Sequence, residues 1–319
     1  MKRNIYSYSK LWMILFVLMG AACTNQVEDA IPVSGQPIEF SVQSDWKEIP
    51  NTRLVDDNGT MKFTQGDGIQ IFGFHTSPSG EVKKFMYDVD NSRKGQLVTY
   101  DGNNWNYSPK RFWPKEGKLD FFASYPQNSI HNDEVNQPMI YEQTANSMKQ
   151  DLLWGVSTKN DCASDARKKN VDITMKHALA KVNISIDNSW GPIGTVIVSA
   201  YKEAGHFTNT DVNGIPEWEI KDKDKTIDAV FGFYDLIKDG IFTSVTVFIL
   251  PGNITGFQMF DVPSHPNEDG HKIAASDEIS KKIQEKTFEA GKAYKLTIRR
   301  AQKNTNSRSI AMSVRCVSE

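Results

Sequence analysis

The chain has 319 residues, of which 39% are hydrophobic and 24% charged, a mixture that excludes a coiled coil, a collagen and a wholly disordered chain. The formal net charge of -2 at pH 7 comes without a basic stripe, which argues against nucleic acid as the partner. One hydrophobic core seldom serves more than about 250–300 residues, so we expect two domains.

The N-terminus has the features of a secretory leader. Basic residues in the first ten positions precede an apolar run, Leu11–Met19, and small residues follow at positions 20–22. The run is shorter than the about 20 residues that span a bilayer core, so we predict a removable signal peptide over residues 1–22. This leader holds three of the 37 basic residues and none of the 39 acidic ones, so the remaining chain is more acidic.

Cys23 follows the small residues directly. The pattern resembles the lipobox of bacterial lipoproteins, in which the cysteine is acylated and becomes the new N-terminus, although Gly20 stands where leucine is usual. Several acyl chains at Cys23 (palmitate among them) would anchor the protein stably to a membrane, and residues 23–36 read as a flexible tether. The alternative is an ordinary secretory signal with an unrelated cysteine.

Period-two alternation broken by turn residues dominates the rest of the chain and predicts an all-β fold of short antiparallel strands. Two polar stretches, 127–146 and 157–170, are expected to be surface loops. Expected strands in the first half are 38–44, one from residue 63, 69–72, 84–89, 96–100, 105–107 and 119–124.

The segment 171–187 alternates throughout, but its apolar phase changes near Ala178–Lys181. A phase change in a strand indicates a bulge, a short helical link or a strand that leaves one sheet for another. We therefore expect one β-sandwich over residues 37–179 and a second over 180–300.

The second half continues with strand patterns and one short helical pattern. A helix is expected from Ser276 to Lys286, because Ile279 and Ile283 share one face. Expected strands are 195–201, 229–233, 243–250 and 292–299.

The last segment, residues 301–319, reads as a polar linker followed by one more strand. Apolar side chains alternate there with polar or small ones. This strand either folds back on its own sheet or is given to another molecule, and the pattern leaves both open. The apolar positions are Ile310, Met312, Val314 and Cys316.

Five phrases, in this order and spacing, carry a resemblance to a known family: TRLVDDNGTMKFTQGDGIQIFGF, NNWNYSPKRFWPKEGKLDFFASYP, DLLWGVSTKN, ITMKHALAKVNISI and FEAGKAYKLTI. From about Cys23 to Arg299 the chain resembles the fimbrillin-like proteins, the lipoprotein pilins of type V pili in Gram-negative anaerobes. The resemblance implies two tandem transthyretin-like antiparallel β-sandwich domains.

The resemblance also implies a route of assembly. The protein would be exported, lipidated, moved to the surface of the outer membrane and cut there by an arginine-specific protease, with Arg53–Leu54 as the candidate bond. Cutting would displace the first strand, and a donor strand from another fimbrial subunit would fill the groove in a fimbrium that supports adhesion or biofilm. The displaced strand carries Ile38, Phe40 and Val42; the donor strand carries Ile310, Met312, Val314 and Cys316.

Two other classes of function stay open on the sequence. The first is a non-polymerising surface lipoprotein of the outer membrane: a pilus anchor, a pilus tip, or a module that binds a glycan or a host protein. The aromatic residues of segment 105–125 would suit a sugar-stacking platform as well as a packed core. An enzyme is the least supported class, because the six histidines show no HExxH spacing and no GxSxG motif occurs.

No cofactor or metal is expected. Asp88–Asn91 lacks the spaced glycine and final glutamate of a calcium loop and reads as a turn. His177 is expected to be a packed histidine, and a disulfide between Cys162 and Cys316 is possible without support from their spacing.

Overall fold

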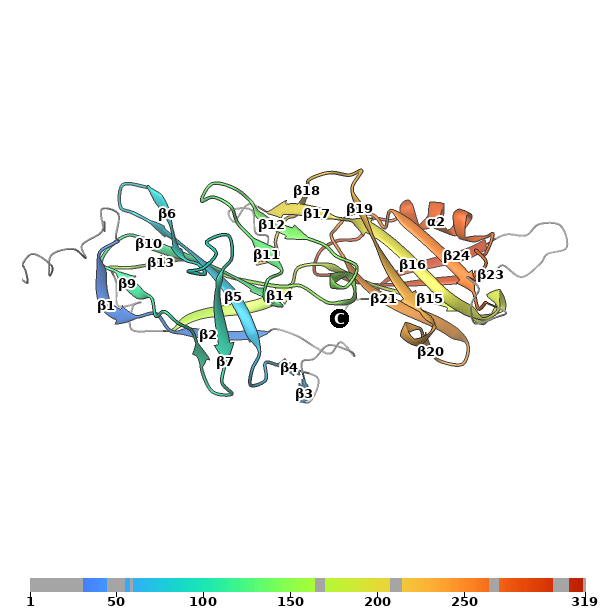
Figure 1. Cartoon of the computed structure of the whole chain (residues 1–319), viewed down its shortest axis with the longest axis horizontal. Helices are drawn as coiled ribbons and strands as arrows, with labels where there is room; N and C mark the ends of the chain where they lie inside the picture. Colours follow the sequence, from blue (N-terminus) through green and yellow to red (C-terminus); the bar gives the residue numbers. More distant parts are fainter. Residues whose placement is uncertain are drawn as a thin grey trace, which may run out of the picture.

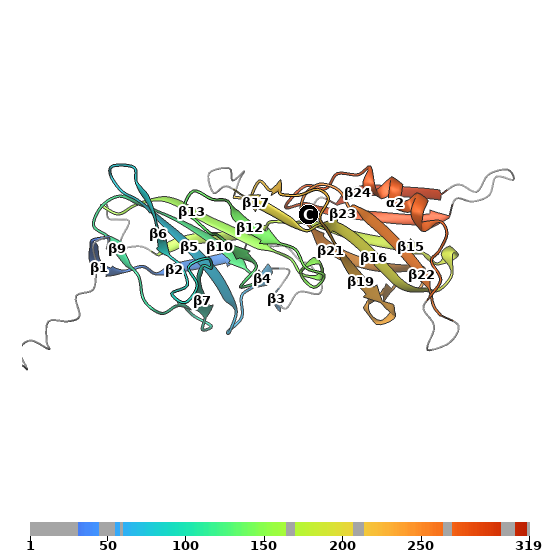
Figure 2. The same cartoon turned by 45° about the horizontal axis from the view of Figure 1, so that its top comes forward.

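The computed structural model describes residues 31–44, 55–57, 60–163, 170–206, 214–263, 270–300 and 310–317. These residues form an elongated all-β structure with two lobes that lie end to end (Figure 1), and the turned view agrees (Figure 2). Within them, one α-helix of several turns, α2 (Ser276–Gln284), packs along β22 (Gly256–Asp261). It confirms the predicted helix, with two fewer residues at its C-terminal end.

The first lobe is built on an eight-stranded sheet. Its order is β2 (Phe40–Ser44), β14 (Val171–His177), β13 (Leu153–Asp161), β10 (Lys118–Tyr125), β5 (Gly68–Thr76), β7 (Gln96–Tyr100) and β8 (Trp105–Asn106), with β6 (Val82–Met86) also paired to β5. Two small pairs accompany it: β1 (Val33–Pro37) with β9 (Phe112–Pro114), and β3 (Val55–Asp57) with β4 (Thr60–Lys62).

Strand β5 shows why this sheet is central. Seven consecutive residues of β5 are buried, because its two faces belong to different hydrophobic clusters. Ile69 and Ile71 face one cluster, which contains Phe40 and Phe121. Phe72 lies in another, against the second lobe. A strand covered on both faces loses the burial alternation of a half-exposed strand, and here even Gln70 and His75 are buried.

A four-stranded sheet joins the two halves of the sequence: β11 (Ile130–His131), β12 (Met139–Glu142), β17 (Glu203–His206) and β18 (Glu219–Ile220). Strand β12 pairs with β17, so a first-half strand meets a second-half strand. The expectation of a surface loop over 127–146 was therefore wrong, since the segment contains β12, whose residues Met139 and Tyr141 are buried. The expected loop over 157–170 was wrong at its start, because β13 extends to Asp161.

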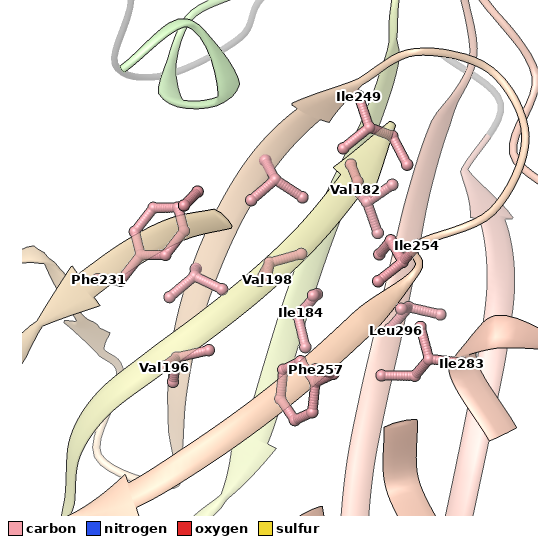
Figure 3. Close-up of a cluster of buried hydrophobic side chains, with 14 of the residues drawn as sticks. Val182, Ile184, Val196, Val198, Phe231, Ile249, Ile254, Phe257, Ile283 and Leu296 are labelled. Atoms are coloured by element: carbon pink, nitrogen blue, oxygen red, sulfur yellow. The ribbon is translucent and has the colours of Figure 1, made fainter. Parts of the chain in front are cut away.

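The second lobe packs two sheets face to face. One has the order β20 (Ile237–Lys238), β21 (Phe242–Ile249), β15 (Ala180–Asp187), β23 (Ala293–Arg300) and β24 (Ile310–Val317). The other has the order β19 (Thr226–Gly232), β16 (Ile193–Tyr201) and β22. Apolar side chains from both sheets and from α2 interdigitate between them (Figure 3), among them Ile184, Val198 and Ile283.

Strands β14 and β15 explain the phase change in segment 171–187. They belong to different sheets, and only Ala178 and Leu179 separate them. Of the three alternatives, the strand that changes sheets is the one observed. Ile173 faces the first-lobe cluster and Ile184 the second-lobe cluster, so each apolar phase serves its own core.

Candidate functional site

The predicted first strand lies at the edge of the first-lobe sheet. Strand β2 pairs in parallel with β14 through five register pairs, from Phe40 opposite Val171 to Ser44 opposite Met175. Ile38 precedes the strand and is fully buried, Phe40 is 4% exposed, and Val42 packs against the same cluster. The three apolar positions predicted from the sequence therefore face one core.

Aromatic contacts hold Phe40 in that core. Its ring meets the ring of Phe121 edge-on, with centroids 5.3 Å apart, and tilts against Tyr107 at 5.7 Å. Burying a side chain of this size is worth roughly 1.5–3 kcal/mol. Removing the strand would therefore open an apolar groove beside β14.

A second attachment holds the same segment, and no pattern in the sequence indicated it. Strand β1 pairs with β9, and the Ile38 amide donates to the Arg111 carbonyl at 2.9 Å. The Tyr107 hydroxyl donates to the Ile38 carbonyl at 2.6 Å, and the Lys110 ammonium lies 3.1 Å from the Glu39 carboxylate. Residues 31–44 thus contact the first lobe through two different strands, β9 and β14.

The Tyr107 hydroxyl gives a direct test of this attachment. Tyr107→Phe is expected to lower the free energy of unfolding by about 1 kcal/mol, because the buried carbonyl of Ile38 loses its donor. Denaturant unfolding at pH 7 measures the change. No loss of stability would mean that the hydrogen bond contributes nothing to holding the segment.

The same residue predicts a pH dependence. Burial raises the pKa of Tyr107 from 10.0 to about 12. The unfolded state therefore releases this proton first, and stability falls as pH rises from about 10 to about 12. Tyr107→Phe should make this alkaline decline shallower. Burial also raises the pKa of Tyr141. Tyr141 therefore contributes to the alkaline decline equally in the native chain and in Tyr107→Phe.

The predicted donor strand lies at the edge of the other lobe. Strand β24 pairs antiparallel with β23 through eight register pairs, from Arg300 opposite Ile310 to Ala293 opposite Val317. It ends the five-stranded sheet, so in this single chain the last strand lies on its own sheet. Both strands that the sequence singled out are therefore edge strands.

The remaining predicted site residues fall outside this geometry. Cys23, Arg53 and Leu54 lie outside the described residues. Cys162 is buried in the first-lobe cluster, whereas Cys316 stands opposite Tyr294 in the second-lobe sheet. The two cysteines belong to different lobes, which does not support a disulfide between them.

The aromatic segment 105–125 mostly packs inside the first lobe. Trp105, Trp113 and Phe121 are buried, as the alternation around Trp105 indicated, while Phe112 is 38% exposed. A flat stacking platform for sugar is therefore not formed by this segment.

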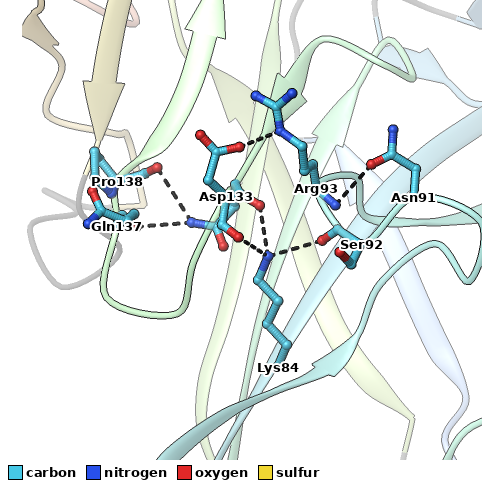
Figure 4. Close-up of polar contacts among 8 residues, drawn as sticks. Lys84, Asn91, Ser92, Arg93, Asp133, Gln137 and Pro138 are labelled. Atoms are coloured by element: carbon cyan, nitrogen blue, oxygen red, sulfur yellow. Dashed lines mark hydrogen bonds and ion pairs between the residues drawn. The ribbon is translucent and has the colours of Figure 1, made fainter.

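Polar clusters of the described residues are structural in character. The Lys84 ammonium donates to the backbone carbonyls of Ser92, Asn132 and Asp133 at 2.8–3.0 Å (Figure 4). Burial lowers the pKa of Lys84, against the opposing influence of the nearby acidic residues. The network ties the loop after β6 to the loop after β11.

The other sequence candidates for chemistry also have structural roles. The Asp90 amide donates to the Asp88 carboxylate at 2.9 Å, which fits a turn. The His177 ring contacts the buried carboxylate of Asp151, so this histidine is packed and hydrogen-bonded as expected. The part of the chain that the structure describes has no cluster of three metal-ligating side chains and no helix long and apolar enough to cross a membrane.

The comparison with known families decides what kind of protein this is. The sequence pattern of the fimbrillin-like family matches residues 52–313. This chain belongs to the fimbrillin-like family. The match covers the described strands from β3 to the first half of β24, and it begins one residue before Arg53.

A curated relative of this fimbrillin-like protein is the fimbrium subunit Fim1C of Phocaeicola vulgatus. The two are 23% identical over 214 residues, which is 60% of this chain and 55% of Fim1C. The chain therefore spans little more than half the length of that relative.

Two solved structures resemble the fimbrillin-like chain over most of its length. A proposed cell adhesion protein from Bacteroides uniformis is 17% identical with a TM-score of 0.46, covering 88% of this chain and 98% of that one. The fimbrial anchor protein Mfa2 from Porphyromonas gingivalis is 9% identical with a TM-score of 0.39, covering 87% and 97%.

Proposed function

We propose that this fimbrillin-like protein is a structural subunit of a fimbrium, assembled by strand exchange after proteolysis. The observation that carries the proposal is that two strands, one in each lobe, lie at the edges of their sheets. Strand β2 covers an apolar core from the edge of the first lobe, and β24 lies at the edge of the second. An edge strand can leave its sheet without breaking the pairing of two neighbours.

Cutting at Arg53 would separate both β1 and β2 from the rest of the chain. The body would then expose the edge of β14 and the space left by Ile38 and Phe40. An exposed apolar groove with unpaired backbone groups favours the addition of another strand.

Strand β24 has the right pattern to fill that groove. Its apolar positions Ile310, Met312 and Val314 repeat the spacing of Ile38, Phe40 and Val42. Three such side chains would regain roughly 1.5–3 kcal/mol each on burial. The joint between subunits would therefore be long-lived.

The route to the surface belongs to the same proposal. Residues 1–22 would direct export, a lipid on Cys23 would hold the precursor on the outer membrane, and an arginine-specific protease would release it into a fimbrium. We further propose that residues 37–179 and 180–300 are two transthyretin-like sandwich domains joined by the strand change at Ala178 and Leu179. No catalytic step is proposed.

Treatment of purified residues 24–319, which lack the lipidated cysteine, with an arginine-specific protease tests the proposal. We expect a new N-terminus at Leu54 and a ladder of multimers on unboiled SDS gels. Deleting residues 310–319 should remove the ladder and leave the cut unchanged, while Arg53→Gln should prevent both.

One outcome would favour the alternative function. A cut at Leu54 without any ladder, or resistance at Arg53, would point to a pilus anchor, a pilus tip or a monomeric surface lipoprotein. Glycan arrays and host-protein binding assays would then be the next measurements.

A further inference from the structure

An exposed apolar surface lies on the second lobe, and we name it the distal patch: Val230, Phe233, Tyr234, Ile237 and Ile241. Among the described residues eleven large hydrophobic side chains are exposed, and these five fall within twelve consecutive positions. Tyr234 is fully exposed and Ile241 is 63% exposed. Large apolar side chains exposed together in one short stretch of a domain indicate an interaction site.

The distal patch lies at the end of the second lobe that faces away from the first. It is formed by the end of β19, the turn η5 (Phe233–Asp235), the edge strand β20 and the turn into β21. Phe242 pairs with Asp187, at the opposite end of β15 from Ala180, where the chain arrives from the first lobe. Figure 1 shows β20 on the lower right of the molecule.

Two carboxylates beside the distal patch are already paired within the chain. The Asp235 carboxylate accepts from the Gly232 amide at 3.1 Å and pairs with Lys149 at 3.2 Å. The Asp239 carboxylate accepts from the Phe242 amide at 2.7 Å. A sugar site needs convergent polar groups beside its aromatic rings. The surface here combines aromatic and aliphatic side chains with carboxylates that are already paired, and this fits a protein partner.

The path of the chain indicates which protein. Arg300 and Ile310 are register partners at this same end of the second lobe. If β24 is given to a neighbour, as the proposed function requires, the nine residues 301–309 must connect Arg300 to that neighbour. Nine extended residues reach at most about 30 Å. The neighbouring subunit must therefore lie near this end of the second lobe, the end that also carries the distal patch.

A matching surface lies at the outer end of the first lobe, near the start of β2. A pocket of about 330 Å³ is lined there by Tyr87, Arg111 and Phe112 of the body and by Val33 of β1. Release of β1 would widen this pocket, since Val33 lies before the candidate bond. We infer that the distal patch, with Tyr234 at its centre, docks on the Tyr87–Phe112 surface of a second copy of this chain.

Charge and geometry agree with this pairing. The segment Thr226–Phe242 carries three acidic residues and one basic residue, whereas Tyr107–Lys115 carries three basic residues and no acidic one. Arg299 and Arg300, on β23 of the same sheet, are held over the aromatic rings of Phe242 and Trp190 in their own lobe. Two different surfaces at opposite ends of one molecule give a head-to-tail contact that repeats along a filament.

Site-specific crosslinking tests the docking. Tyr234 is replaced by photoreactive p-benzoylphenylalanine in the mature chain, which is irradiated before and after protease treatment. We expect crosslinked dimers whose linked peptide lies within residues 85–112 of the other copy. The same photoreactive residue at Leu97, which is 45% exposed on β7, is the matched control and should give none. Absence of dimers, or linkage elsewhere, would overturn the inference.

A pair of substitutions gives an independent readout. Tyr234→Ser with Ile241→Ser should weaken self-association at least about tenfold in sedimentation experiments, as expected when central interface side chains are lost. Leu97→Ser should leave it unchanged. Because Tyr234 and Ile241 are well exposed, the thermal unfolding of the double variant should match that of the native chain.

The outcomes separate docking from strand exchange. Crosslinks at position 234 without a ladder after cleavage would support the docking surface and count against strand exchange. A ladder that neither crosslinks at position 234 nor responds to the double substitution would support strand exchange and overturn the docking surface.

Discussion

A disulfide between positions 297 and 313 is expected to abolish multimer formation completely, and reduction is expected to restore it. Thr297 on β23 stands directly opposite Ser313 on β24. Opposite residues of an antiparallel pair have Cβ atoms about 4.5–5.5 Å apart, close to the separation that a disulfide bridges. Thr297→Cys with Ser313→Cys would therefore lock the last strand on its own sheet.

The locked protein separates two uses of β24. If the strand must leave its sheet to join subunits, the oxidised double variant remains monomeric after cleavage at Arg53, and a reducing agent releases the ladder. The single variants Thr297→Cys and Ser313→Cys, treated with the same oxidant, should multimerise normally. A ladder from protein whose disulfide is verified by mass would refute donation of β24.

Trp154→Ala is expected to lower the free energy of unfolding by about 3–5 kcal/mol. Trp154 is fully buried, stacks on Phe122 with ring centroids 5.9 Å apart and meets the ring of His206 at 5.5 Å. Phe122 comes from the first half of the chain and His206 from the second. The cavity would therefore weaken the contact between the lobes as well as the sheet that carries β13.

Chemical denaturation, followed by one probe in each lobe, measures this effect. We expect a lower midpoint, and we expect the transitions of the two lobes to separate as their shared cluster is lost. Tyr234→Ala is the matched aromatic control and should change stability by less than about 0.5 kcal/mol, because Tyr234 is fully exposed. A loss below about 1 kcal/mol for Trp154→Ala would contradict the assignment of this cluster as the joint.

The sequence by itself determined the fold class, the family and the long strands. Segments such as β15 and β16 alternate over eight or nine residues, and a repeat of that length is visible without any knowledge of the partner strands. The phase change near Ala178 was visible for the same reason. The buried positions of the first strand, Ile38 and Phe40, also followed from alternation alone.

Only the tertiary structure decided the short strands and the use of the edges. Strands β1, β11 and β18 have two to five residues, too few for a period to appear, and their pairing depends on partners far away in the sequence. Whether β24 pairs with a strand of its own chain likewise depends on its register with β23.

Exposure was decided in the same way. Tyr234 and Trp154 are both aromatic, yet one is fully exposed and the other fully buried. A local pattern records which residues share a face of a strand. It does not record which faces find another surface to pack against, because burial depends on contacts between segments that are distant in the chain.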